Sequence, residues 1–123
     1  MKVLLNPLLK FNMEKITYND FEKLEIRTGT ILEVQEFPGA KKPAFQLTID
    51  FGDLGIKRSS AQITVHYDKE VLIGKQIVAV VNFPVKQIAN FFSECLVLGV
   101  MQLDGSVILL HPDKTIENGL RIA

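Results

Sequence analysis

The sequence is poor in the residues that build disulfide-linked or metal-held scaffolds. Its 123 residues include one cysteine, Cys95, and two histidines, His66 and His111. A single cysteine cannot form a disulfide within the chain, and no cysteine or histidine cluster offers zinc ligands. We therefore expect a fold that rests on its apolar core, in a reducing compartment, with no metal and no cofactor.

The chain also lacks net charge and long apolar runs. Fourteen basic and fourteen acidic residues cancel, whereas domains that track phosphate backbones are usually basic. The apolar start of the chain is interrupted by Asn6 and Pro7, and no segment reaches the roughly 20 apolar residues that cross a bilayer. We expect a cytoplasmic protein with no membrane span, in which any anion binding depends on local arrangement.

Catalytic signatures are missing as well. The sequence has no H-x-x-x-H motif, no nucleophile elbow and no glycine-rich phosphate loop. Cys95 stands between Glu94 and an apolar run, which indicates a buried, inert thiol. The sequence therefore predicts that the protein is not an enzyme.

What the sequence does contain is a series of short strand patterns separated by turns. The clearest is "AFQLTIDF", where apolar and polar residues alternate with a period of two. Gly29 suggests a bulge or bend in the first strand, and Asp104-Gly105 predicts a hairpin turn. The expected strands cover residues 26–37, 44–51, 56–63, 76–83, 95–101 and 106–110.

Only short helices fit between these strands. Thr17 and Asp20 have capping-box spacing at the start of one short helix, and Gly74 can end another. This pattern predicts an all-β fold, a five-stranded OB-fold (Greek-key) barrel with short helices and extra C-terminal strands. A small sandwich remains open on the pattern alone. We expect one domain over residues 16–123, preceded by an N-terminal extension, residues 1–15, whose order the sequence leaves open.

Two stretches are candidates for a binding surface. In "KRSSAQIT", residues 57–64, every second residue from Arg58 onward is polar. On a strand these side chains share one face, so that face meets solvent or a ligand. In residues 82–92, three phenylalanines are interleaved with polar residues, and Lys86 is the only charge. Phenylalanine rings can stack on bases or apolar side chains. The alternatives are a solvated barrel face for the first stretch and a plug of the barrel end for the second, with one of Phe91 and Phe92 exposed.

The segments "DFEKLEIRTGTI", "KRSSAQIT" and "GKQIVAVVNFPVKQIANFFSECLVLG" resemble the CsaA family of secretion-related chaperones. That family lies within a wider group of OB-fold tRNA-binding domains that includes the C-terminal appendage of many methionyl-tRNA synthetases. The resemblance implies a homodimer that binds exposed peptide segments of unfolded or exported proteins, and tRNA-binding relatives use the equivalent face. It implies a site formed by Lys57, Arg58, Ser59, Ser60, Gln62, Asn82, Phe83, Pro84, Lys86, Ser93 and Glu94, with Lys41 and Lys42 as weaker candidates.

The chain departs from the family pattern in the second stretch. Val85, Gln87 and Phe92 stand where proline, arginine or lysine are common, so phosphate contacts are lost and apolar area is gained. We therefore add Phe92 to the site and expect a non-catalytic chaperone, with the secretion machinery as a further partner. The alternative is a tRNA-binding protein that acts in trans through the same face. A third interpretation makes the phenylalanine-rich stretch the dimer contact, although the resemblance implies a dimer through Phe21, Leu103 and Ile108.

Overall fold

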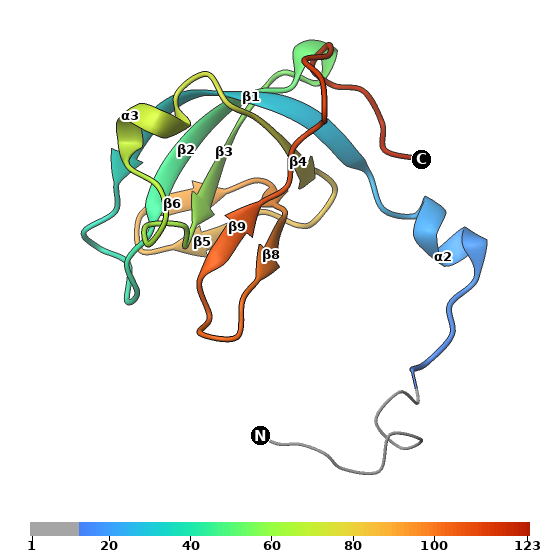
Figure 1. Ribbon diagram of the computed structural model, residues 1–123, viewed down its shortest axis with the longest axis horizontal. Coiled ribbons are helices and arrows are strands. Elements are labelled where there is room, and N and C mark those ends of the chain that lie inside the picture. Colours follow the sequence, from blue (N-terminus) through green and yellow to red (C-terminus); the bar gives the residue numbers. More distant parts are fainter. Residues whose placement is uncertain (1–12) are drawn as a thin grey trace.

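A five-stranded antiparallel sheet, curled into a nearly closed barrel, forms the centre of the molecule (Figure 1). The computed structural model describes residues 13–123. Neighbours in the sheet follow the order β3-β2-β1-β4-β7, so β3 and β7 are its two edges. The strands are β1 (Ile26–Glu36), β2 (Phe45–Asp50), β3 (Ile56–Ala61), β4 (Gln76–Val80) and β7 (Leu96–Val97). The prediction of an all-β OB-fold barrel is confirmed.

The alternation of apolar residues places the core inside this barrel. Phe45, Leu47 and Ile49 of β2 are buried, while the residues between them are half-buried. This is the burial pattern expected of a strand with one face on a core. From β4, Ile77 to Val80 are all buried, because β1 and β7 flank this strand within the curled sheet.

Gly29 has a different role from the one that its sequence context indicated. The register of β1 against β2 shifts between Ile31 and Glu33, so the bulge lies beyond Gly29. A Cβ atom on Gly29 would lie 2.7 Å from the ring of Phe51. Gly29 is therefore required for close packing of β1 on the core, and the bulge in this strand begins two residues further along.

The short helices form where the sequence carries capping signals. Helix α2 (Tyr18–Glu22) begins at Thr17, whose hydroxyl accepts from the Asp20 amide at 3.1 Å, while the Asp20 carboxylate accepts from the Thr17 amide at 3.1 Å. Helix α3 (Lys69–Leu72) buries Leu72 and is followed by Gly74 in a left-handed conformation, with φ of +89°. A 3₁₀ turn, η1 (Gly52–Leu54), connects β2 to β3.

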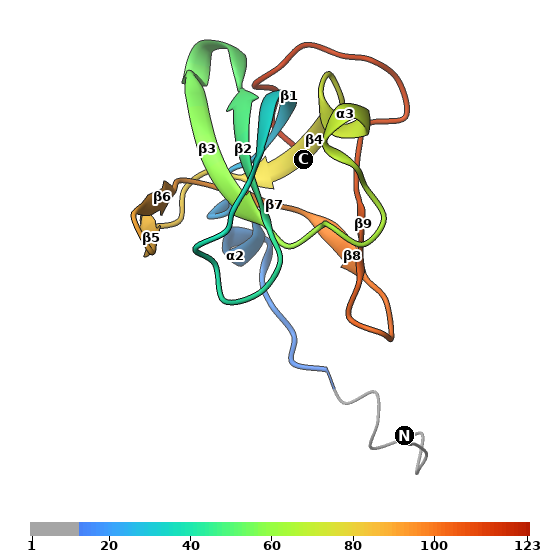
Figure 2. The ribbon, with the colours of Figure 1, turned by 90° about the vertical axis from the view of Figure 1, so that its left-hand side faces the viewer.

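Two small hairpins stand on either side of β7 (Figure 2). One consists of β5 (Lys86–Ile88) and β6 (Phe91–Ser93), and the other of β8 (Gly99–Met101) and β9 (Val107–Leu109). The predicted turn at Asp104-Gly105 is confirmed, with φ of +88° at Gly105. The strand expected over residues 95–101 is divided into β7 and β8, and the stretch interpreted as a loop after β4 contains the β5–β6 hairpin.

Two further predictions concern the N-terminal extension and the absence of a membrane-spanning helix. Most of the predicted N-terminal extension, residues 1–15, lies outside the described residues. No helix within residues 13–123 is long and apolar enough to cross a membrane.

Candidate binding groove

An apolar groove of about 570 Å³ opens between the two small hairpins and the end of β3. Residues 60–63 form one side, and residues 95–99 form the other. Phe83 and Pro84 from the loop after β4 also line it, as do Met101 and Val107 of the β8–β9 hairpin. Lys86 is the only charged residue among those that line this groove.

The structure brings the two predicted stretches together at this groove. The residues predicted for the site that line it are Ser60, Gln62, Phe83, Pro84, Lys86 and Ser93. They come from β3, from the loop after β4, and from the β5–β6 hairpin. These residues lie more than 20 positions apart in the sequence. They share one surface because β6, and β7 directly after it, both lie beside the edge of β3.

Arg58 and Glu94 fasten the β5–β6 hairpin to β3 rather than lining the groove. The Arg58 guanidinium lies over the ring of Phe91, 4.4 Å from its centroid, and donates to the Gln46 side-chain oxygen at 3.3 Å. The Glu94 carboxylate accepts from the Arg58 backbone amide at 2.9 Å, and the Glu94 amide donates to the Arg58 carbonyl at 2.7 Å. Both residues position the surface, and Lys57 beside them is half-buried.

A second, smaller apolar cluster supports the same hairpin. Phe37, Ala44 and Phe91 are buried together, and Ile88 packs against them. The rings of Phe37 and Phe91 lie 5.3 Å apart between centroids. Because Phe91 turns inward, Phe92 points outward and is 55% exposed, which confirms that one of this pair is exposed.

The weaker candidates, Lys41 and Lys42, are exposed on the connection between β1 and β2. That connection approaches the hairpin turn, since a Cβ atom on Gly39 would lie 3.5 Å from the Ala89 Cβ. Neither lysine lines the groove. They lie on the same side of the barrel as the hairpin, outside the groove itself.

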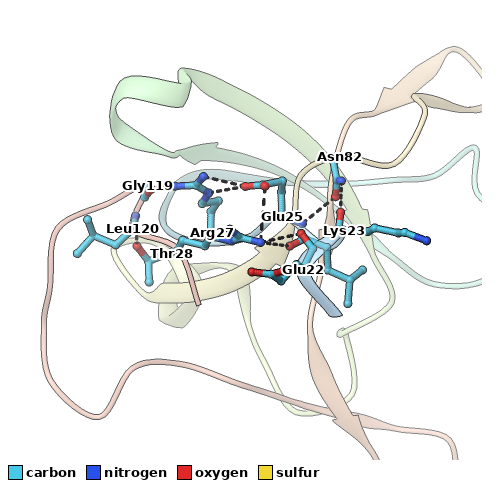
Figure 3. A network of polar contacts seen from close by, with 10 residues as sticks. Glu22, Lys23, Glu25, Arg27, Thr28, Asn82, Gly119 and Leu120 are labelled. Atoms are coloured by element: carbon cyan, nitrogen blue, oxygen red, sulfur yellow. Dashed lines mark hydrogen bonds and ion pairs between the residues drawn. The ribbon is translucent and has the colours of Figure 1, made fainter. Parts of the chain in front are cut away.

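Ser59 and Asn82 are two predicted site residues whose side chains form hydrogen bonds within the chain. Ser59 is 1% exposed, and its hydroxyl donates to the Cys95 carbonyl at 2.8 Å. The Asn82 amide donates to the Lys23 carbonyl at 2.7 Å and accepts from the Glu25 amide at 3.0 Å (Figure 3). The polar atoms of both side chains are used within the chain, because Ser59 has the inward parity of β3 and Asn82 ties β4 to the start of β1.

The start of β1 is also held by a charged network (Figure 3). Arg27 donates to the Glu25 carboxylate at 2.7 and 3.1 Å and to the Gly119 carbonyl at 3.0 Å. These hydrogen bonds from Arg27 hold the pKa of the Glu25 carboxyl below its usual value. The network joins the N-terminal part of the domain to its C-terminal segment, next to the loop that carries Phe83.

Comparison with known proteins identifies the domain. Residues 26–121 match the family model described as "Putative tRNA binding domain". The chain belongs to this family. It is 34% identical over 109 residues to the methionine–tRNA ligase of Parabacteroides distasonis, and it spans about a sixth of the length of that enzyme.

Solved structures place this tRNA-binding-family domain in the CsaA group. The chaperone CsaA of Bacillus anthracis is 51% identical with a TM-score of 0.86, and the match covers 89% of this chain and all of that one. The CsaA chaperone protein of Picrophilus torridus is 60% identical with a TM-score of 0.83, over the same shares of the two chains. The resemblance to CsaA read from the sequence is thereby confirmed.

Part of the groove in this CsaA-type domain was not predicted from its sequence. Residues 96–99, Met101 and Val107 line the groove, but the sequence assigned them only to strands. The signal lies in "CLVLGVM", which is apolar on both parities. A strand that is apolar on both faces needs a second partner for its outer face, and here that face borders the groove.

Cys95 lies at the bottom of the groove and is buried. Burial raises the pKa of its thiol from 9.0 to about 11. The thiol is therefore protonated near neutral pH, as expected for an inert cysteine, and it contributes a small apolar surface.

Proposed function

We propose that the protein is a non-catalytic, CsaA-like chaperone that holds exposed peptide segments of unfolded or exported proteins. The observation that carries this proposal is the groove, which is lined mainly by apolar residues and by one charge, Lys86. Phe83, which lines it, is 50% exposed, and Phe92, on the outer face of the adjoining β5–β6 hairpin, is 55% exposed. Exposed rings beside an apolar concavity are typical of a surface that buries apolar segments of a partner.

The energetics favour reversible holding. Burying one large apolar side chain contributes about 1.5–3 kcal/mol, so two or three client side chains give weak to moderate affinity once ordering costs are subtracted. Such binding requires no nucleotide cycle. The two CsaA proteins named as chaperones, from B. anthracis and P. torridus, support the same interpretation.

An aggregation assay tests this proposal. We expect stoichiometric protein to slow the light scattering of an unfolding client, and we expect the double variant Phe83→Ala, Phe92→Ala to lose most of this effect. Ile56→Ala, which removes an exposed apolar side chain at the other end of β3, is the matched control and should act like the wild type. Equal protection by both variants, or none by the wild type, contradicts the proposal.

The family match supports tRNA binding in trans as a second function. Arg58 on β3 and Lys86 on β5 are exposed, and the β5–β6 hairpin also carries the exposed ring of Phe92. Cations and exposed aromatic rings on one side of an OB barrel suit single-stranded nucleic acid. This function requires binding that weakens steeply as salt rises, whereas apolar peptide binding changes little. Competition between labelled tRNA and an apolar peptide at two salt concentrations separates the two, and no shift of tRNA even at low salt removes the second.

The proposal includes the setting in which the protein works. We infer a homodimer in the cytoplasm, with unfolded or pre-secretory polypeptides as clients and the secretion machinery as a further partner. The zero net charge is consistent with clients that are selected by apolar segments rather than by charge.

A further inference from the structure

The groove follows an open seam of the barrel. The edge strands β3 and β7 are not paired with each other in the described part of the chain. One side of the groove is lined by residues 60–63, which are the last two residues of β3 and the two that follow it. The other side is lined by residues 95–99, which include β7. An OB barrel that is open at this point presents two strand edges to whatever occupies the groove.

One half of the seam is closed by local contacts. The Arg58 amide and carbonyl bond to Glu94, and the Ser60 amide donates to the Ser93 hydroxyl at 3.1 Å. In an antiparallel ladder, alternate residues turn their backbone groups away from the paired strand. Arg58 and Ser60 turn theirs away from β2, and Gln62, one residue beyond the end of β3, has the same parity and lines the groove.

Beyond Ser60 the backbone groups that face the seam have no partner within residues 13–123. This applies to the Ser60 carbonyl and to both backbone groups of Gln62. On the other side, the Cys95 carbonyl accepts from Ser59 across the seam. Val97 has the same parity as Cys95, and its backbone groups are likewise unpaired with other parts of the described chain.

We propose that a client enters the seam as an added β-strand. Its backbone bonds to Ser60 and Gln62, and every second side chain enters the apolar groove. This inference rests on the proposed chaperone function and specifies how that site recognises its client. Strand addition bonds the main chain, which is common to all polypeptides, so it gives affinity with little sequence preference.

Charge and shape complementarity define the client further. Lys86 is the only charged residue that lines the groove, so neutral or acidic apolar segments fit better than basic ones. A volume of about 570 Å³ lies in the range of ligand pockets. RNA lacks the alternating amide and carbonyl groups of a strand, so the open seam itself favours a polypeptide.

A backbone-methylation series tests the strand. The probe is a labelled peptide of about nine residues, with alternating leucine and serine and one terminal aspartate. Single N-methyl groups, placed at successive residues, remove one N–H each and leave the side chains unchanged. We expect affinity losses of about ten-fold at every second residue and little loss between them, because only alternate N–H groups face β3.

A variant at Gln62 tests the same edge from the protein side. Gln62→Pro removes the N–H that faces the groove, whereas Gln62→Ala keeps it and serves as the matched control. This N–H has no partner in the described chain, so its loss breaks no internal hydrogen bond. Because both variants lose the Gln62 side chain, their difference isolates the N–H: we expect peptide binding about ten-fold weaker for Gln62→Pro than for Gln62→Ala, with thermal unfolding as the check on folding.

The outcomes separate the two proposals. If the unmethylated peptide binds and every methylated peptide binds equally well, the groove holds side chains alone and strand addition is overturned, while the chaperone function stands. If the folded protein binds neither this peptide nor an unfolded client, both proposals fail. Should Gln62→Pro not fold, the methylation series on the wild-type protein decides.

Discussion

Asn82 joins the loop of the groove to the start of the barrel. Its side chain bonds the backbone at Lys23 and Glu25, which are 59 and 57 residues away. We expect Asn82→Ala to lower the free energy of unfolding by about 1–2 kcal/mol, because two hydrogen bonds are lost. Urea unfolding measures this, and an unchanged midpoint would show that the two bonds add nothing to stability.

Cys95 gives the protein a pH dependence at the alkaline end. The pKa of its thiol rises from 9.0 to about 11 on folding, so the folded state holds the proton more tightly. The free energy of unfolding is therefore unaffected by ionisation of this thiol below pH 9. It falls as pH rises from 9 towards 11, because only the unfolded chain ionises in that window. At pH 10 the loss is on the order of 1 kcal/mol.

Comparison with Cys95→Ala isolates this thiol from lysines and tyrosines that titrate in the same range. Urea unfolding at pH 8 and pH 10 gives the change in free energy of unfolding for each protein. We expect the wild type to lose on the order of 1 kcal/mol more than the variant between these pH values. Equal losses would mean that Cys95 ionises as readily in the folded state as in the unfolded chain.

Single residues also show which features of the site can be predicted from the sequence. The parity of β3 correctly separated Arg58 and Gln62, which are exposed, from Ala61 and Ile63, which are buried. The same alternation predicts that Ser59 faces the core, whereas the family resemblance assigned Ser59 to the ligand-binding site. Its partner, the Cys95 carbonyl, is 36 residues away, and no local pattern predicts such a contact.

At the scale of elements, the β5–β6 hairpin depends on one ring. Phe91 packs with Phe37 and Ala44 and lies under the Arg58 guanidinium. We expect Phe91→Ala to cost about 3–4 kcal/mol and to raise hydrogen exchange across residues 86–93, since the small cluster is the main support of this hairpin. Phe92→Ala, on the exposed face, should change stability by less than about 0.5 kcal/mol while it weakens client binding.

The hairpin itself was missed, and the reason is physical. Its strands have three residues each, too short for a period of two to appear. Its turn has Ala89 with φ of 54°, where glycine or asparagine is the usual signal. By contrast, β1 to β4 were predicted within a few residues, because each is long enough or apolar enough to show its buried face.

On the scale of the whole molecule, apolar surface is concentrated in the β8–β9 hairpin as well as beside the groove. Val100 is 54% exposed, and Met101 and Leu103 are exposed more fully. A neutral protein with a large uncovered apolar hairpin favours self-association. Met101 of this hairpin also lines the groove, whereas Leu103 does not and Phe92 lies on the β5–β6 hairpin. Variants at Leu103 and at Phe92 therefore test dimer formation and client binding separately.

The proposed homodimer gives the test at this scale. We expect the wild type to elute at about twice the 13.8 kDa of one chain, and Leu103→Glu to elute as a monomer because it places a charge on the apolar hairpin. Light scattering coupled to size-exclusion chromatography measures the mass. Phe92→Ala is the control and should remain dimeric, because the dimer is expected to use the β8–β9 hairpin. A wild-type monomer would contradict the proposed assembly, whereas a monomeric Phe92→Ala variant would move the contact to the β5–β6 hairpin and leave the groove competing with the dimer for one surface.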